Sequence, residues 1–114
     1  MKNVSTTALS ASLVISSSPA KLIRITGTNS KASTQYIQVH DAASLPADTA
    51  VPKITMPVPA DTPFMLEFND TGRNFDNGIV VCNSSTEATK TLGSADCWFD
   101  AQVVPVDGDA NYNR

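Results

Sequence analysis

The fold is decided by the stretch Phe75–Ser84, which reads FDNGIVVCNS. The pair Asn77-Gly78 is a turn signal, and we expect Gly78 to have a positive φ because glycine has no Cβ to oppose it. The apolar run Ile79–Cys82 then predicts a central strand. A turn followed by a strand is the unit from which the rest of the chain is built.

The same period-two pattern continues on both sides of this stretch, with apolar and polar residues alternating over short runs. The expected strands contain Leu13 and Ile15, Leu22–Thr26, Gln35–His40, Ile54 and Met56, Phe64–Phe68, Ile79–Cys82, and Trp98–Val104. Only Glu87–Leu92 could form a single helical turn. The pattern predicts an all-β protein, an antiparallel β-sandwich (jelly-roll or Ig-like) of about seven to eight strands with helix below ~10%.

Turn residues separate the expected strands at short intervals, and prolines mark turns and sheet edges because they cannot donate to a ladder. The separators are Pro19, Gly27-Thr28-Asn29, Pro46, Pro57, Pro59, Pro63, Gly72, Asn77-Gly78, Gly93 and Pro105. The expected core is Ile23, Ile25, Ile37, Val39, Phe64, Leu66, Phe68, Ile79, Val81, Phe99 and Val103.

The length and the charge of the chain limit the number of domains and the kinds of partner that we expect. Its 114 residues predict one domain, residues 1–114, and charged residues make up only 17% of them. The eight basic residues are scattered, so no clustered positive face is expected for nucleic acid or for an anionic membrane. A surface of uncharged polar groups suits a chain packed against other chains.

The two ends of the chain lack expected core residues. Ala8–Ile15 is a thin apolar stretch interrupted by serines, so we interpret the start as mature chain and not as a signal peptide. We expect residues 1–7 and 106–114 to be short tails that other subunits hold in order.

Two cysteines, Cys82 and Cys97, are too few for a zinc site with four ligands. A disulfide between them remains an alternative, but we favour two free, partly buried thiols in a reducing cytoplasm.

The spacing of the candidate catalytic residues in the sequence does not fit a known catalytic arrangement. His40 and Asp41 are adjacent, so their side chains are expected to diverge from a strand, with His40 on the surface and Asp41 opening a turn. Neither Ser84 nor Ser85 lies in a nucleophile-elbow motif. Glu67 alternates with apolar residues and is expected to face solvent or an interface. We predict a non-enzymatic protein with no cofactor, no metal ion and no catalytic residue.

The ordered set of strands and turns between about Pro19 and Val104 resembles small virion structural proteins of tailed bacteriophages. The resemblance is carried by a strand ending in Gly27-Thr28-Asn29, by YIQVHDA (36–42), LPAD (45–48), Val51-Pro52, the strand Phe64–Phe68, and FDNGIVV (75–81) leading to Ser85-Thr86. It implies a β-sandwich, a non-enzymatic role and a place in the particle.

From this resemblance we expect a capsid decoration (cement) protein on the virion surface, made in the cytoplasm of the host bacterium. Its expected partner is the major capsid protein, and it is expected to be a homo-oligomer such as a trimer. A tail, neck or baseplate component is the alternative, in which case the partners are tail proteins. A carbohydrate- or receptor-binding sandwich is an alternative of another class. The candidate interface residues are Tyr36, Met65, Glu67, Trp98, Val106 and Tyr112.

Overall fold

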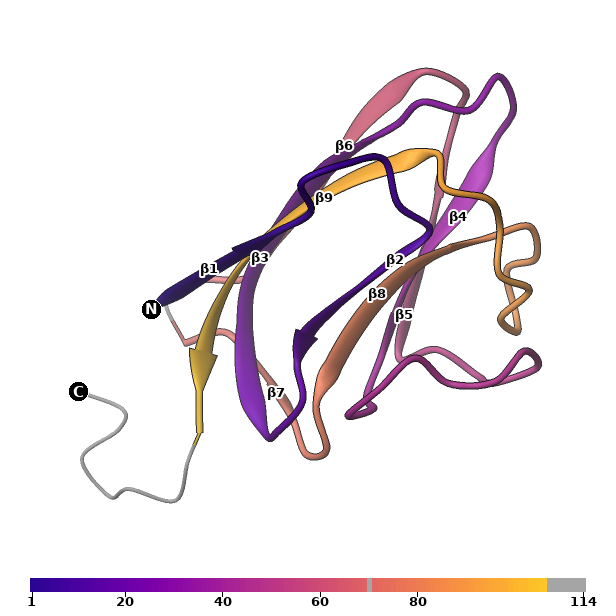
Figure 1. Ribbon diagram of the computed structural model, residues 1–114. Helices are drawn as coiled ribbons and strands as arrows, with labels where there is room; N and C mark the ends of the chain where they lie inside the picture. Colours follow the sequence, from indigo (N-terminus) through magenta and orange to yellow (C-terminus); the bar gives the residue numbers. More distant parts are fainter. Residues whose placement is uncertain (70, 107–114) are drawn as a thin grey trace.

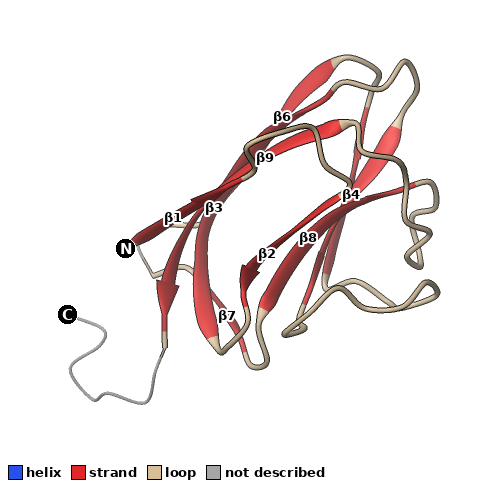
Figure 2. Ribbon diagram, viewed as in Figure 1, coloured by secondary structure: helices blue, strands red, loops and turns tan. Residues whose placement is uncertain are grey.

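The protein is a sandwich of two antiparallel sheets. The computed structural model describes residues 1–69 and 71–106, and these form nine strands and no helix (Figures 1 and 2). The strands are β1 (Lys2–Ser5), β2 (Ser12–Ser16), β3 (Ala20–Asn29), β4 (Gln35–His40), β5 (Ile54–Val58), β6 (Thr62–Glu67), β7 (Arg73–Phe75), β8 (Ile79–Ser84) and β9 (Cys97–Pro105). The predicted all-β class is confirmed, with nine strands in place of seven to eight.

The strands divide into a five-stranded and a four-stranded sheet. The five-stranded sheet has the order β1-β9-β3-β6, and β7 pairs with the first residues of β3, before the segment that pairs with β6. The four-stranded sheet has the order β2-β8-β4-β5, so β8 lies between two neighbours as the apolar run Ile79–Cys82 predicted. The prolines Pro57 and Pro63 lie in β5 and β6, which end their sheets, where a missing N–H disturbs no ladder.

The hydrophobic core fills the space between the sheets. It is formed by Ile15, Ala20, Leu22, Ile25, Ile37, Val39, Val58, Phe64, Phe75, Ile79, Val81, Cys97, Phe99, Ala101 and Val103. Leu66 and Phe68 are only partly buried against it. The predicted Ile23 is buried, but Leu22 and not Ile23 belongs to the cluster between the sheets, because the register of β3 against β9 shifts between Leu22 and Arg24. Such a bulge reverses the alternation of side chains, which the sequence pattern did not reveal.

Two predicted boundaries are wrong. Residues 1–7 are not a loose tail, since β1 pairs with β9 from Lys2 opposite Val103 to Ser5 opposite Asp100. Gly27-Thr28-Asn29 is not a turn but the end of β3, paired with β9 on one side and β6 on the other. Glycine is required at 27 because a Cβ there would lie 2.0 Å from the carbonyl oxygen of Trp98.

Cys82 and Cys97 are both free and fully buried. Cys97 belongs to the core cluster between the sheets, whereas Cys82 alternates with the core residue Val81 and therefore faces away from the core. Burial raises the pKa of the Cys82 thiol to about 12 and also raises that of Cys97. Both side chains therefore stay protonated and pack as small apolar groups at neutral pH.

No helix in the described part of the chain is long and apolar enough to cross a membrane.

Candidate functional site

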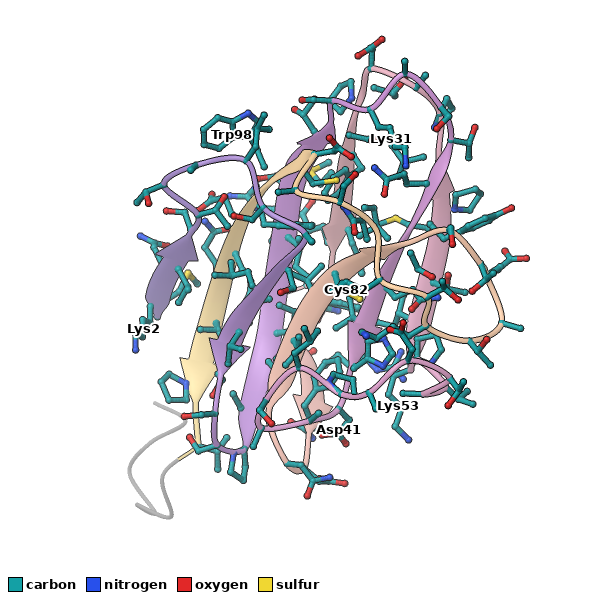
Figure 3. All side chains as sticks on the ribbon, turned by 45° about the vertical axis from the view of Figure 1, so that its right-hand side comes forward. Lys2, Lys31, Asp41, Lys53, Cys82 and Trp98 are labelled. Atoms are coloured by element: carbon teal, nitrogen blue, oxygen red, sulfur yellow. The ribbon has the colours of Figure 1, made fainter. Side chains whose placement is uncertain are left out.

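The outer face of the five-stranded sheet is the part of the molecule best suited to bind a partner. Alternation along β9 directs Trp98, Asp100 and Gln102 away from the core, while Phe99 and Ala101 point into it. Trp98 is 43% exposed, and Figure 3 shows its ring projecting beyond the ribbon. A large aromatic side chain held on a strand and left in solvent is a good interface anchor.

The register of the ladders brings three of the predicted interface residues onto this one face. Trp98 lies opposite Thr28 of β3, and Met65 of β6 lies opposite Thr26, two residues earlier in the same strand. Met65 is 58% exposed, and Glu67 follows it on the same face of β6. The face therefore combines an aromatic and a thioether side chain with polar neighbours.

A polar row fixes one end of this face across three strands. Arg24 of β3 lies between Gln102 of β9 and Glu67 of β6. Its Nε donates to Gln102 Oε1 at 3.0 Å, and its Nη1 lies 3.8 Å from Glu67 Oε2. The two contacts link the guanidinium to both neighbouring strands, although an exposed ion pair of this kind adds little stability. Arg24 and Gln102 were not among the predicted site residues, and only the strand register identifies them.

The other three predicted interface residues lie elsewhere. Tyr36 is on β4 in the four-stranded sheet, opposite Pro57 and Ser84, and so is separated from Trp98 by the whole core. Val106 follows β9, where its N–H donates to the carbonyl oxygen of Pro19 at 2.9 Å. Tyr112 lies outside the described residues.

The outer face of the four-stranded sheet is covered, in contrast, by the loops 41–53 and 85–96, which we call the covering loops. Figure 3 shows the loop that carries Asp41 and Lys53 in front of this sheet. Gln38 of β4 is fully buried beneath them. Its Nε2 lies 2.9 to 3.2 Å from three backbone carbonyl oxygens, those of Thr86, Glu87 and Thr89. These contacts hold residues 86–89 as an irregular loop without the helical turn considered for Glu87–Leu92.

Lys90 joins the two covering loops. The side chain of Lys90 is 3% exposed, and its Nζ lies 2.5 Å from Asp48 Oδ1. The backbones are joined as well, since Thr49 N donates to Lys90 O and Lys90 N donates to Ala50 O. Thr49 has a φ of 81°, which is costly for a β-branched residue and is held by these contacts.

His40 and Asp41 diverge as expected, but the predicted surface position of His40 is wrong. His40 is 2% exposed, and its Nε2 lies 3.2 Å from Gln38 Oε1. Burial, followed by the nearby positive charge of Lys90, lowers the pKa of His40. Asp41 accepts hydrogen bonds from the backbone N–H groups of the turn 76–78, and these bonds lower its pKa although slight burial opposes them. Asp41 thus holds the turn that precedes β8.

Two grooves are lined by described residues. One groove, about 600 Å³ in volume, lies between β1 and β2, and the other, about 330 Å³, lies beside Val106. Neither groove is lined by a histidine or a cysteine. Within residues 1–69 and 71–106, no three His, Cys, Asp or Glu side chains are placed to hold a metal ion.

Comparisons with known proteins leave the function to be argued from this geometry. No family model, no curated protein and no solved structure matches the chain.

Proposed function

We propose that this protein is a non-enzymatic structural component of a tailed-phage virion, a decoration protein that binds neighbouring major capsid subunits. The observation that carries the proposal is the uncovered outer face of the five-stranded sheet, where Trp98 and Met65 stand exposed above a row held by Arg24. The resemblance of residues 19–104 to small virion structural proteins is the reason for placing the protein in a phage particle.

The face suits attachment better than catalysis. Trp98 and Met65 are carried by strands, so their backbone positions are fixed before binding and little order has to be gained on contact. Aromatic residues and Met are enriched at protein interfaces, and they are the residues expected to enter pockets of the partner. The exposed Glu67 lies at the edge of the patch, where a charge affects orientation more than affinity.

Such a protein acts by the sum of many small binding energies. A folded sandwich that contacts two neighbouring capsid subunits opposes their separation by its own binding free energy. Repetition over the equivalent sites of a particle multiplies the effect. No chemical step is needed.

Binding to empty capsids tests the proposal. Full-length protein is incubated with capsids of the phage that encodes it, and the bound amount is measured after sedimentation. We expect Trp98→Ala and Met65→Ala each to reduce the affinity at least about tenfold. Val51→Ala is the matched control, since Val51 is 75% exposed but lies in a covering loop of the opposite sheet. Equal binding by all variants would remove this face from the proposal.

The copy number in purified particles separates the alternatives. Hundreds of copies support a capsid protein, whereas a small multiple of three or six indicates a tail, neck or baseplate component. Absence from particles together with Trp98-dependent binding to glycans would favour the carbohydrate-binding alternative.

A further inference from the structure

The turn before β8 contains Asn77-Gly78, the single place in the chain where a glycine follows an asparagine. This order favours a spontaneous reaction of asparagine, in which the backbone nitrogen of the next residue attacks the side-chain carbonyl carbon. Glycine permits the attack because it has no side chain to obstruct the approach. Asn77 is exposed, so water reaches its side chain and ammonia can leave from it. The turn therefore carries the groups of a modification site.

The reaction consumes one water molecule and releases one ammonia molecule. Gly78 N first loses its proton to solvent and attacks Asn77 Cγ. The N–Cγ bond forms, the Cγ–Nδ2 bond breaks, and Nδ2 leaves as ammonia with a proton from solvent. Water then opens the resulting succinimide ring at one of its two carbonyl carbons. Opening at Cγ gives aspartate, and opening at the backbone carbonyl carbon gives isoaspartate, whose main chain contains an additional methylene group.

The carboxylate of Asp41 is bound to the nitrogen that has to attack. Gly78 N donates to Asp41 Oδ1 at 3.4 Å, and Asn77 N donates to the same oxygen at 2.8 Å. Asp76 N donates to Oδ2 at 3.3 Å. The three hydrogen bonds hold the backbone of the turn in one arrangement. They also hold the proton that the first step must remove.

The charge of Asp41 and the burial of Gly78 oppose the same step. Slight burial raises the pKa of Asp41, but the three N–H groups and the charge of Lys53 together lower it below the ordinary 3.8, so the side chain is ionised at neutral pH. A negative charge disfavours a second one nearby, and loss of its proton would leave Gly78 N negative. Gly78 itself is buried, with Ala42 O and Ser16 O packed close to where a Cβ would lie. Hydroxide therefore cannot approach from these sides.

We propose that Asn77 is a deamidation site and that the Asp41 carboxylate keeps its reaction slow by holding the proton of Gly78 N. The isoaspartate product would lengthen the main chain directly before β8 and displace the N–H groups of residues 77 and 78 from Asp41. Because β8 lies between β2 and β4, such a change disturbs the middle of its sheet. Protection of one backbone nitrogen thus preserves the sandwich.

Deamidation of the full-length protein, followed by mass spectrometry of the tryptic peptide 74–90, tests the proposal. The same peptide, released before incubation, is the unprotected reference. We expect the wild type to react at least about tenfold more slowly than this peptide, and Asp41→Asn to react at least about tenfold faster than the wild type. Asp76→Ala is the matched control, because it removes an equal charge from an exposed side chain of the same turn. Its rate is expected to stay close to that of the wild type.

Amide hydrogen exchange separates the role of Asp41 from unfolding, because base-catalysed exchange removes the same proton of Gly78 N. In Asp41→Asn, exchange at Gly78 should rise with the deamidation rate, while exchange at Val81, inside the sheet, should stay at the wild-type rate. An equal loss of protection at Val81 would assign the faster reaction to unfolding and overturn the proposal.

Two further outcomes would also overturn it. One is equal deamidation in the wild type and in Asp41→Asn, and the other is a wild-type rate equal to that of the free peptide. Since no capsid is present, the result does not depend on the proposed function.

Discussion

The outer faces of the two sheets differ in what surrounds their polar side chains. On the five-stranded sheet, Arg24 and Gln102 contact each other in partial exposure, and Trp98 stands in solvent. On the four-stranded sheet, Gln38 and His40 are buried below the covering loops. Strands in both sheets, such as β4 and β9, alternate polar with apolar residues. The difference comes from the loops, which cover one face and leave the other free to bind.

This comparison explains where stability and binding reside. A buried polar group costs free energy unless it is hydrogen-bonded, so most buried polar groups of the covered face need partners, and Thr55 Oγ1 is an exception that has none among the described residues. Gln38 has three carbonyl oxygens as partners, and Lys90 has Asp48. On the exposed face, water can replace any lost partner. Substitutions are therefore expected to affect folding on the covered face and association on the exposed one.

The largest effect is expected where a covering loop starts. Gly78 has a φ of 159°, and a Cβ there would lie 2.5 Å from Ala42 O and 2.6 Å from Ser16 O. Gly78→Val should lower the free energy of unfolding by at least about 2 kcal/mol, because backbone on two sides must move. Urea denaturation measures the loss, with Ala47→Val at another exposed position of the loop as the control. An unchanged midpoint would mean that the loop is not fixed at this contact.

A smaller loss of unfolding free energy is expected when the covering loop 85–96 loses the hydrogen bonds that Gln38 donates to it. Gln38→Ala removes the contacts with three partly buried carbonyl oxygens and should cost about 2 kcal/mol of unfolding free energy. The matched variant on the exposed face, Gln102→Ala, should cost less than about 1 kcal/mol, because water reaches Arg24. Thermal unfolding of the two variants decides the point. Equal losses would contradict the contrast between the faces.

A charged side chain on each face, Lys90 on the covered one and Arg24 on the exposed one, allows the same comparison for ion pairs. Lys90→Met should lower the free energy of unfolding by about 1 kcal/mol, because it removes the link to Asp48 while the half-exposed carboxylate regains water. Arg24→Met should change it by no more than about 0.5 kcal/mol. Chemical denaturation at low and high salt measures both. If Arg24→Met lost more unfolding free energy than Lys90→Met, the ion pair on the exposed face would be the more stabilising one, and the contrast between the two faces would be contradicted.

The smallest effect concerns pH. The pKa of His40 is lowered in the folded protein from the ordinary 6.5, so the unfolded chain binds the proton first as the pH falls. The contribution of neutral His40 is complete above pH 6.5 and is lost as the pH falls below it, with a slope under about 1.4 kcal/mol per pH unit. His40→Gln should remove this slope. Since His40 is the single histidine of the chain, a slope that persists between pH 7 and pH 5 in the variant would contradict the assignment.

Sequence reasoning succeeded where a residue's position depends on its near neighbours. Gly78, with Asp76 and Asn77 before it, predicted the turn, and the apolar run after it predicted the central strand. It failed for β1, because the polar residues Lys2–Ser5 have no pattern of their own and are ordered by pairing with β9. For the candidate site it identified Trp98, Met65 and Glu67 singly, but not Arg24, which depends on the register of three strands.

The sequence by itself determined the class of this protein. Alternation of apolar and polar residues, punctuated by glycine and proline, is compatible with antiparallel strands and with little else, because side chains of a strand alternate between its two faces. Tertiary structure alone decided which polar residues are inside. His40 and Gln38 carry the pattern of solvent-facing residues, yet both are buried, and the loop that Gln38 contacts lies more than forty residues further along the chain. The sequence pattern records which side of a strand a residue occupies, whereas burial depends on what the rest of the chain places over that side.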